Sequence, residues 1–382
     1  MDLFKEFKVL YDLNEEKYSQ NEKTFINDKL GRFEEYGREL YEGWNWEWPM
    51  LSDQESDKFR HPQIDNLINE KETDFEKKVN WPRNKSFALC LTHDVDYISV
   101  YPWKERVRSL LYSKKTKIND FFTLLFASIK NILLSLLNFY KNTSYPLDKY
   151  IGIEESLNFK STFFFVIDYR IRRKSHTKDC FYSFEDSIKY ENKSLKLKKV
   201  INLISEKGWE IGLHGSIFSQ EKDMLLREKI FLEKIISSKI TSNRFHYLNF
   251  DIEKSIKKLV DADFSIDCSL GSNVDNGYRC GTGLPYKIYN NDSKELFTLP
   301  LIIQDNQILS KFNFNKEKIL KEVKKIFLIA SKNHSCVTLL WHPNFKEDSA
   351  EFDIYKSILE LANEMNAWGC SAFDLVSHIN NK

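Results

Sequence analysis

Short apolar runs alternate along most of this chain with longer stretches in which apolar residues recur at helical spacing. The first pattern predicts buried strands and the second predicts amphipathic helices. The strand-like runs are 87–96, 161–167, 208–216, 243–248, 264–269, 296–303 and 336–344. The helical stretches are 151–159, 195–207, 221–238, 252–262, 316–331 and 352–363. This alternation predicts an α/β fold in which a parallel sheet forms a β/α barrel.

Two carboxylates end the first strand-like run, Phe-Ala-Leu-Cys-Leu-Thr-His-Asp-Val-Asp. Side chains alternate faces along an extended chain, so Asp94 and Asp96 point the same way. Two carboxylates on one face cannot both ionise cheaply without a cation or a proton between them. A metal ligand beside a catalytic base is the functional interpretation. The structural alternative, solvated aspartates at an exposed strand end, is far commoner for a motif of this kind.

Three later strand-like runs carry a histidine at or near their end: His214 in Glu-Ile-Gly-Leu-His, His246 in Arg-Phe-His, and His342 in Leu-Leu-Trp-His. The active sites of β/α barrels lie at the carboxyl ends of the strands. One such histidine is usually a core or surface residue. Three of them together with the aspartate pair predict a shared site at one end of a barrel.

These motifs and their order resemble the polysaccharide deacetylases with the NodB-homology domain, which form carbohydrate esterase family 4. The subgroup that the chain resembles opens with Thr-His-Asp-Val-Asp, as residues 92–96 do here. The resemblance covers roughly residues 86–376. It implies a distorted parallel (β/α)7 barrel that holds a divalent metal, usually zinc, and removes N- or O-acetyl groups from sugars.

The resemblance also implies roles for individual residues. Asp94 matches the general base, and Asp96 and His214 match two metal ligands. Arg244 matches the arginine that orients the base, and His342 matches the general acid.

The chain departs from the family pattern at the third metal ligand. The family has His-x-x-x-His, but Phe218 stands four residues after His214. The family's Arg-x-Pro is replaced by Arg-Phe-His, which ends in His246. Hydrolytic zinc takes three protein ligands and a water, so we expect His246 to supply the missing imidazole. His93 is a weaker candidate, because alternation turns it away from Asp96, and a packing or supporting role is expected for it.

Three residues are candidates for binding substrate. Asp267 lies where the family places a polar residue near the substrate or the base-orienting arginine, although it could equally cap a strand end. Arg279 lies in the loop Gly-Tyr-Arg-Cys-Gly-Thr-Gly, where it could reach a carboxylate or phosphate or simply belong to a turn. This loop lacks the following Lys-Ser/Thr of a phosphate-binding loop. Tyr247, next to His246, is the third candidate.

Composition narrows the class of partner. The 382 residues contain 57 Lys and Arg against 56 Asp and Glu, so the basic excess of a nucleic-acid-binding protein is absent. The six cysteines are scattered without a Cys-x-x-Cys pair, as expected for reduced thiols. The charged start of the chain does not resemble a signal peptide. Together these features predict a cytoplasmic protein.

The sequence divides into an N-terminal extension, residues 1–80, and a barrel domain, residues 81–382. The extension contains an aromatic patch at 43–49, either a sugar-stacking platform or an arm docked on the barrel. A helical insertion at about 104–146 begins with a basic run and continues as an apolar stretch at 121–137. Lys130 and Asn131 interrupt that stretch and argue against a transmembrane span. An interfacial helix, with peripheral contact to the inner face of the membrane, and a lid on the barrel both remain open.

We therefore expect a metal-dependent hydrolase, acting on carbon–nitrogen bonds other than peptide bonds, that deacetylates an amino sugar in surface-polysaccharide biosynthesis. Its acetylated sugar substrate would be a polymer, a sugar-nucleotide or a lipid-linked precursor. The expected cofactor is a divalent metal, with Zn²⁺ the first choice. The alternative is a catalytically silent, sugar-binding member of the fold that scaffolds glycan assembly. The missing second histidine favours the alternative, while an intact acid and base pair argues against it.

Overall fold

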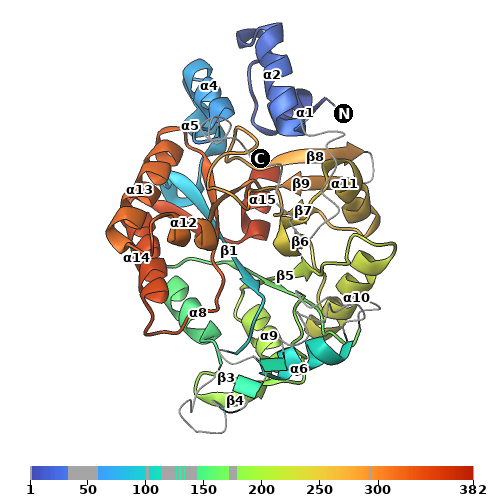
Figure 1. The fold of residues 1–382 in the computed structure, drawn as a ribbon. Helices are drawn as coiled ribbons and strands as arrows, with labels where there is room; N and C mark the ends of the chain where they lie inside the picture. Colours follow the sequence, from blue (N-terminus) through green and yellow to red (C-terminus); the bar gives the residue numbers. More distant parts are fainter. Residues whose placement is uncertain are drawn as a thin grey trace.

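A curled and mostly parallel sheet forms the centre of the molecule, with helices around it (Figure 1). The structure is a computed structural model that describes residues 2–32, 59–99, 103–112, 125–126, 129–130, 133, 144–171, 179–291 and 294–381. Within these ranges the main sheet has ten strands: β1 (Phe87–Val95), β2 (Thr162–Phe165), β5 (Glu210–Gly215), β6 (Ser242–Phe245), β7 (Ile266–Asp267), β8 (Tyr286–Asn291), β9 (Lys294–Thr298), β10 (Leu301–Gln304), β11 (Cys336–Leu340) and β12 (Ala367–Cys370). The α/β fold class expected from the sequence is confirmed.

The strand order places the carboxyl ends of the parallel strands together. The order is β10-β11-β1-β2-β5-β6-β7-β9-β8, and β12 pairs with β1 outside this path. Each of these pairs is parallel except β8 with β9. On one edge of β1, β12 pairs with the first half of the strand and β2 with the second. The predicted barrel strands therefore end at one edge of the sheet, which is where the candidate site residues lie.

The predicted strand at 296–303 is two strands, β9 and β10. Pro300 separates them, and proline has no N–H to donate to a sheet. Leu299 still donates to the carbonyl of Asp267, and Leu301 donates to the carbonyl of Leu270, both at 2.9 Å. β10 then pairs with β11, so this one stretch of chain runs from the β7 side of the sheet to the β11 side.

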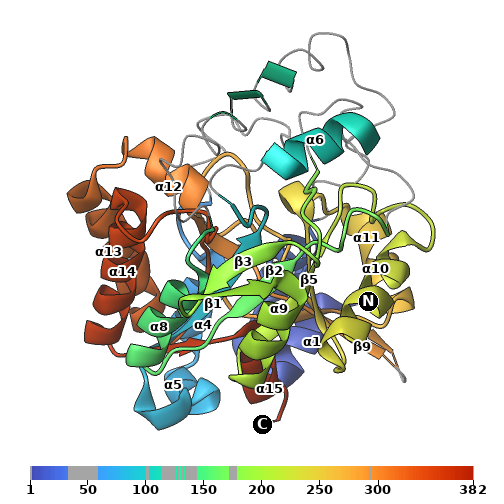
Figure 2. The same ribbon diagram turned by 90° about the horizontal axis from the view of Figure 1, so that it is seen from below.

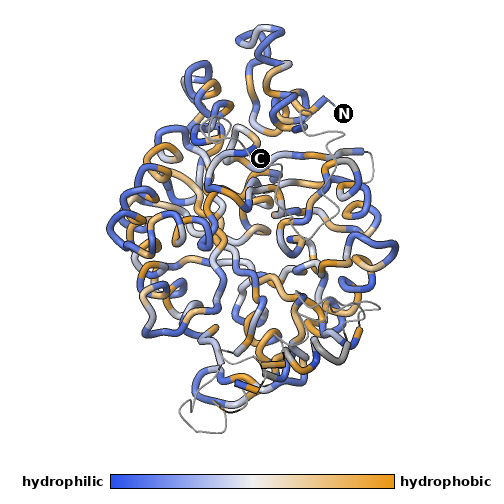
Figure 3. The backbone as a smooth tube through the Cα atoms, in the orientation of Figure 1, coloured by the Kyte–Doolittle hydropathy of each residue, from blue (hydrophilic) through white to orange (hydrophobic). Residues whose placement is uncertain are grey.

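Amphipathic helices cover the sheet. They are α8 (Leu147–Ser156), α9 (Leu197–Glu206), α10 (Met224–Ile236), α11 (Ile252–Asp261), α12 (Asp305–Lys311), α13 (Lys316–Lys332), α14 (Ala350–Glu364) and α15 (Ala372–Asn380). In α9, for example, Leu197, Val200, Ile201 and Ile204 are buried, and this spacing gives one apolar face. Hydrophobic and hydrophilic residues accordingly alternate along each helix (Figure 3). The sequence pattern predicted most of these helices, but not α12 or α15.

The N-terminal helices lie at the end of the molecule opposite the hairpin of β3 (Ser187–Tyr190) and β4 (Lys193–Lys196) (Figure 1). These helices are α1 (Leu3–Leu10), α2 (Gln20–Gly31), α4 (Gln63–Lys71) and α5 (Phe75–Val79). Their apolar residues belong to the same core as the strands. The hydroxyl of Tyr11 donates to the carbonyl of Pro285 at 2.6 Å, and the N–H of Ile64 donates to the carbonyl of Gly281 at 2.8 Å. The aromatic patch at 43–49 lies outside the described residues.

The insertion is described in part. α6 (Trp103–Tyr112) lies on the far side of the sheet from α5 and α15 (Figure 2). Of the apolar stretch, residues 125, 126, 129, 130 and 133 are helical, and Phe126, Ile129 and Leu133 are 68%, 45% and 55% exposed. The remainder of the predicted apolar helix at 121–137 lies outside the described residues. Among the described residues, no helix combines the length and the apolar character needed to cross a membrane.

Candidate functional site

Asp94 and Asp96 lie at the carboxyl end of β1 and approach the same imidazole. Nε2 of His214, on β5, lies 3.3 Å from Oδ1 of Asp96 and 3.8 Å from Oδ2 of Asp94. Asp94 and His214 are buried, and Asp96 is the more exposed of the two aspartates. Both carboxylates therefore face one side of the sheet, as strand alternation predicted.

Arg244, on β6, fixes the orientation of Asp94. Its Nη1 donates to Oδ1 of Asp94 at 2.9 Å and to the hydroxyl of Thr92 at 2.8 Å. Its Nε donates to the carbonyl of Cys268 at 2.9 Å, and the side chain is fully buried. A charge-assisted hydrogen bond in this setting holds the carboxylate in one orientation, with Oδ2 turned toward His214.

Three imidazoles surround Asp96, and together these residues are called the Asp96 cluster. Besides His214, Nε2 of His246 lies 3.6 Å from Oδ1 of Asp96, and Nε2 of His342 lies 3.6 Å from Oδ2. Burial disfavours the charged carboxylate, but the charge of His246, a hydrogen bond from His214 and the charge of His342 outweigh it. The pKa of Asp96 therefore lies well below its usual range. An anionic oxygen among imidazole nitrogens is a donor set suited to a divalent metal.

Each imidazole of the cluster turns its Nδ1 away from Asp96 and toward another acceptor. Nδ1 of His214 lies 2.8 Å from the carbonyl of Arg244, and Nδ1 of His342 lies 2.8 Å from Oδ1 of Asp305. Nδ1 of His246 faces Oδ1 of Asp179 at 3.6 Å. Metal-bound histidines nearly always donate their second ring N–H to a carboxylate or carbonyl. For His214 and His246 the arrangement thus fits a cluster in which the Nε2 lone pairs face a metal.

Among the neighbouring residues, Asp305 raises the pKa of His342 most. It accepts from the backbone N–H of His342 at 2.7 Å and from the ring at 2.8 Å. Burial alone would lower the pKa of His342, but Asp305, with smaller contributions from Asp96 and Asp94, raises it to about 10. For His214 too, the neighbouring aspartates outweigh burial and raise the pKa.

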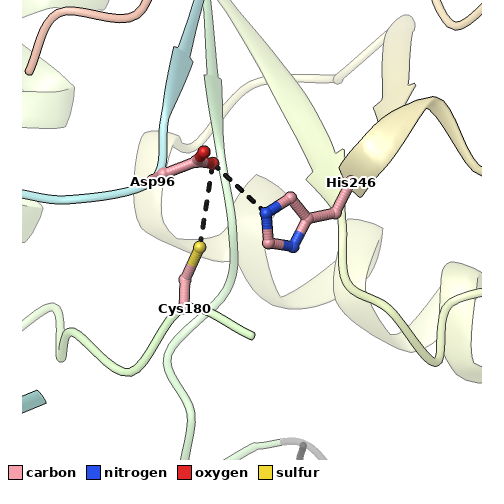
Figure 4. Close-up of side chains that lie close together, drawn as sticks. All are labelled: Asp96, Cys180 and His246. Carbon is pink, nitrogen blue, oxygen red and sulfur yellow. Dashed lines mark hydrogen bonds and ion pairs between the residues drawn. The ribbon is translucent and has the colours of Figure 1, made fainter. Parts of the chain in front are cut away.

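Cys180 also lies at Asp96. Ligand atoms of Asp96, Cys180 and His246 all lie within 4.8 Å of one another (Figure 4). In a tetrahedral zinc site with bonds of about 2.0–2.1 Å, nitrogen and oxygen ligands are roughly 3.3 Å apart. The distances of 3.3 Å and 3.6 Å from Asp96 to His214 and His246 match that spacing. The residues present therefore fit a bound zinc ion.

A strained turn brings His246 to the cluster. β6 ends at Phe245, and His246 opens the short helix η4 (His246–Leu248). Tyr247 and Leu248 follow in the left-handed region, with φ of 59° and 53°, which costs roughly 1–3 kcal/mol for each non-glycine residue. Strand alternation had predicted that His246 lies beside Asp96 and His214. The position is as expected, but a turn and not a continued strand provides it.

His93 lies on the opposite face of β1, as alternation predicted. Its two ring nitrogens lie 2.7 Å from the carbonyl of Trp341 and 2.7 Å from Oε1 of Glu154. Glu154 also accepts hydrogen bonds from Ser161, Trp209 and Tyr355. His93 is fully buried, stacks on a core phenylalanine and so takes part in packing under the site.

The structure brings one of the three substrate-binding candidates to the cluster. Tyr247 is 39% exposed, and its ring stacks on His246 with centroids 4.2 Å apart. Asp267 is fully buried and accepts from the hydroxyl and N–H of Ser269, and burial raises its pKa to about 6. Arg279 is buried, donates to the carbonyl of Gly271, and its own carbonyl accepts from Arg32. Asp267 and Arg279 thus have partners within the fold, and their contacts with substrate stay predictions.

Two residues of the site, Asp305 and Cys180, were not predicted from the sequence. Asp305 follows β10 directly, so the rule that picked out Asp96, a carboxylate at the end of an apolar strand, would also have found it. Cys180 lies in an irregular segment between β2 and β3, where periodicity gives no signal.

Comparisons with known proteins support the fold. No protein-family model matches the sequence, and no curated protein matches it. A provisionally named polysaccharide deacetylase from Mycobacterium smegmatis, of known crystal structure, is 17% identical, with a TM-score of 0.51 over 79% of this chain and 92% of the other. A peptidoglycan deacetylase from Bacillus subtilis is 10% identical over 77% and 92% of the two chains, with a TM-score of 0.38. A pseudoenzyme of carbohydrate esterase family 4 from Bacillus anthracis is 13% identical over 77% and 66%, also with a TM-score of 0.38. At these identities the likeness to the first structure shows a shared fold, the one that the sequence motifs had suggested.

Proposed function

We propose that this chain, which has a polysaccharide deacetylase fold, is a metal-dependent hydrolase that removes an acetyl group from an acetylated amino sugar. The observation that carries the proposal is the pairing of Arg244 with Asp94 directly beside the Asp96 cluster. A protein that only binds sugar needs neither a fixed base nor a protonated histidine opposite it. An aspartate bound by an arginine and a histidine bound by a carboxylate both lie at the carboxyl ends of the strands, which supports the proposal.

Asp96, His214 and His246 would hold the metal. A bound divalent ion would polarise the acetyl carbonyl, lower the pKa of a water molecule and stabilise negative charge on the carbonyl oxygen. The anionic state of Asp96 and the inward Nε2 atoms of the two histidines are what such an ion requires.

Asp94 is the proposed general base. Arg244 occupies Oδ1 of Asp94, and Oδ2 faces the cluster, 3.8 Å from Nε2 of His214. Oδ2 is therefore the oxygen that would take the proton from the attacking water. The fixed guanidinium keeps this oxygen aimed at the cluster throughout the reaction.

His342 is the proposed general acid. The hydrogen bond from Nδ1 to Asp305 keeps the ring protonated and turns Nε2–H toward Asp96. From there the proton would pass to the departing amine of the sugar. Asp94 and His342 would thus serve as a base and an acid on two sides of the same cluster.

Tyr247 is the residue best placed to contact the sugar. Its ring is partly exposed and lies against His246, so an apolar sugar face could stack on it. The proposed pathway is surface-polysaccharide biosynthesis, with a polymer, a sugar-nucleotide or a lipid-linked sugar as substrate. The proposed location is the cytoplasm, which agrees with six buried cysteines that form no disulfide, all six lying in described ranges.

Acetate release from a panel of N-acetylated sugars, with and without a chelator, tests the proposal. We expect release by the zinc-loaded wild type and none after chelation. Asp94→Asn should keep the metal and lose roughly 10²–10⁴-fold in rate, because the water has lost its base. Asp353→Asn, an exposed residue of α14 paired with Lys316, is the matched control and should behave as the wild type.

Two results would count against it. Full release by Asp94→Asn on substrates that the wild type cleaves would refute the role of Asp94. Sugar binding without release by the zinc-loaded wild type would instead favour the silent, scaffolding alternative.

A further inference from the structure

Cys180 is held against the Asp96 cluster by a segment outside the sheet. Its thiol donates a weak hydrogen bond to Oδ1 of Asp96 at 3.8 Å, and the residue is 5% exposed. Cys180 and His246 approach Asp96 from different parts of the chain (Figure 4). The proposed reaction uses no thiol, so the position of Cys180 calls for its own explanation.

Several hydrogen bonds fix this segment. The carboxylate of Asp179 accepts from the N–H of Cys180 at 3.0 Å and faces Nδ1 of His246 at 3.6 Å. The hydroxyl of Tyr182 accepts from the N–H of Val166 at 2.8 Å, just beyond β2. The hydroxyl of Ser183 donates to Asp168 at 2.7 Å. One carboxylate, Asp179, thus supports both Cys180 and His246.

His246 is a second, independent sign of a ligand at this place. The side chain is about 5% exposed, its Nδ1 has no hydrogen-bond partner among the described residues, and its Nε2 points at Oδ1 of Asp96. A buried polar ring normally has a hydrogen-bond partner. A metal beside Nε2 would satisfy His246 and draw Nδ1–H toward Asp179.

The distances from Asp96 to its neighbours match the spacing of ligands around zinc. With zinc–sulfur bonds of about 2.3 Å and zinc–oxygen bonds of about 2.0 Å, a tetrahedral site separates sulfur from oxygen by roughly 3.5 Å. Sγ of Cys180 lies 3.8 Å from Oδ1 of Asp96, while the nitrogens of His214 and His246 lie at 3.3 Å and 3.6 Å from the same atom. Each of the three donors therefore lies at about the distance from Asp96 that neighbouring ligands of zinc have, and Cys180 and His246 also lie within 4.8 Å of each other.

We propose that Cys180 is a fourth protein ligand, whose thiolate closes the metal site and keeps it in a resting state. This inference rests on the metal site of the proposed function. On ligation the S–H bond breaks, the proton passes to solvent and a sulfur–metal bond forms. Closed zinc sites have four protein ligands, whereas hydrolytic ones keep one position for water. The thiolate must therefore leave, and take up a proton again, before water can bind.

Cobalt(II) substitution tests the ligand. Thiolate bound to cobalt(II) absorbs in the near ultraviolet by charge transfer, whether or not the protein is active. We expect this band in the cobalt-loaded wild type and its loss in Cys180→Ala. Cys370→Ala is the matched control, because Cys370 is also buried but its thiol faces the carbonyl of Leu89 in the sheet. Absence of the band from the loaded wild type, or its persistence in Cys180→Ala, would overturn the proposal.

Acetohydroxamate, a small chelator that needs an open coordination position, tests the closure. If the thiolate is bound about nine-tenths of the time, the apparent affinity of the wild type is lowered about tenfold. We expect acetohydroxamate to bind cobalt-loaded Cys180→Ala about tenfold more tightly than the wild type or Cys370→Ala. Equal affinity in all three proteins would overturn the resting state. Neither readout depends on acetate release, so failure of the proposed deacetylation would be seen separately.

Discussion

Each histidine around Asp96 directs one ring nitrogen to the carboxylate and the other to a second partner. We expect that second partner to determine whether the ring is neutral or charged. His214, His246 and His342 all direct Nε2 to the same carboxylate, yet a different oxygen atom lies opposite each Nδ1. A backbone carbonyl leaves His214 free to be a neutral ligand, whereas the Asp305 carboxylate favours the charged ring of His342. In the proposed function, identical side chains would therefore act as ligand or as acid according to the partner of Nδ1.

The ligand role of His246 gives the first prediction at this scale. His246→Ala should weaken zinc binding as much as His214→Ala does. We expect a loss of more than about 100-fold, since even outer-shell partners of a metal site are worth about 10–100-fold. Zinc content after dialysis and calorimetric titration measure the effect. Wild-type zinc affinity in His246→Ala would rule out the assignment.

His93→Ala is the control for this experiment, because His93 is an equally buried histidine on the other face of β1. It should keep zinc affinity. It should also lower the free energy of unfolding by roughly 3–5 kcal/mol, because Glu154 loses its buried partner. Denaturant unfolding measures this loss, and zinc loss without destabilisation would reverse the two assignments.

Strand periodicity was enough to place Asp94, Asp96 and His214, because each lies on or directly after a strand whose alternation can be read from the sequence. It could not place Cys180, whose position depends on hydrogen bonds to Asp168 and Val166 from an irregular segment. Neither could it show that Arg279 is buried, because that burial comes from contact with the distant Arg32.

At the scale of elements, one buried carboxylate of α4, that of Asp65, contributes to the attachment of this helix. Asp65 accepts from the N–H of Gly283 at 3.1 Å and from the hydroxyls of Thr282 and Ser335. Burial, only partly offset by these hydrogen bonds, raises the pKa of Asp65 to about 6. The carboxyl group of Asp65 therefore loses its proton at a higher pH in the folded protein than in the unfolded chain.

Asp65 should make stability fall as the pH rises. The unfolded chain releases this proton near pH 4 and the folded protein near pH 6, so the folded state holds more protons in between. The contribution of Asp65 to the unfolding free energy should therefore drop from pH 4 to pH 7 by about 3 kcal/mol, at ~1.4 kcal/mol per pKa unit. Asp65→Asn should remove this contribution relative to the wild type, as measured by denaturant unfolding at several pH values. Asp74→Asn, an exposed neighbour, should not, and an unchanged difference between wild type and Asp65→Asn across the range would refute the argument.

The insertion is the element proposed to touch a membrane. Phe126, Ile129 and Leu133 are exposed at helical spacing, and the sequence before them is basic. We expect cosedimentation with anionic liposomes at low salt, weakened by added salt and lost on deletion of residues 117–142. Neutral liposomes are the control. A protein that stays in the supernatant at low salt would support the lid on the barrel instead.

The elements that the sequence predicted best are those with one clear period. α13 and α14 lie within two residues of their predicted bounds, since long amphipathic faces leave little freedom. β12 was missed because its four residues, Ala-Trp-Gly-Cys, carry no pattern of their own and become a strand by pairing with β1. The sequence predicted β9 and β10 as one strand, because apolar residues lie on both sides of Pro300.

At the scale of the whole molecule, the site lies at the carboxyl ends of the parallel strands. In β/α barrels the amino-terminal end serves stability and the carboxyl end carries the chemistry. A metal bound only by the folded state should raise stability by about 2.7 kcal/mol at 100 times its dissociation constant. We expect zinc to raise the melting temperature by a few degrees, and chelation to reverse this. His214→Ala should show no shift, and an equal shift in that variant would place the stabilising zinc elsewhere.

The pairing of β1 with β12 has a consequence for synthesis of the chain. Phe87 of β1 pairs with Ala367 of β12. During synthesis, part of one edge of β1 therefore has no partner until β12 has been made. At translation rates of about 5–20 residues per second, that partner follows roughly 15–55 s later. Throughout this interval the nascent chain exposes a sheet edge prone to association with other chains. Efficient production of the protein should therefore depend on chaperones that shield β1 until release from the ribosome.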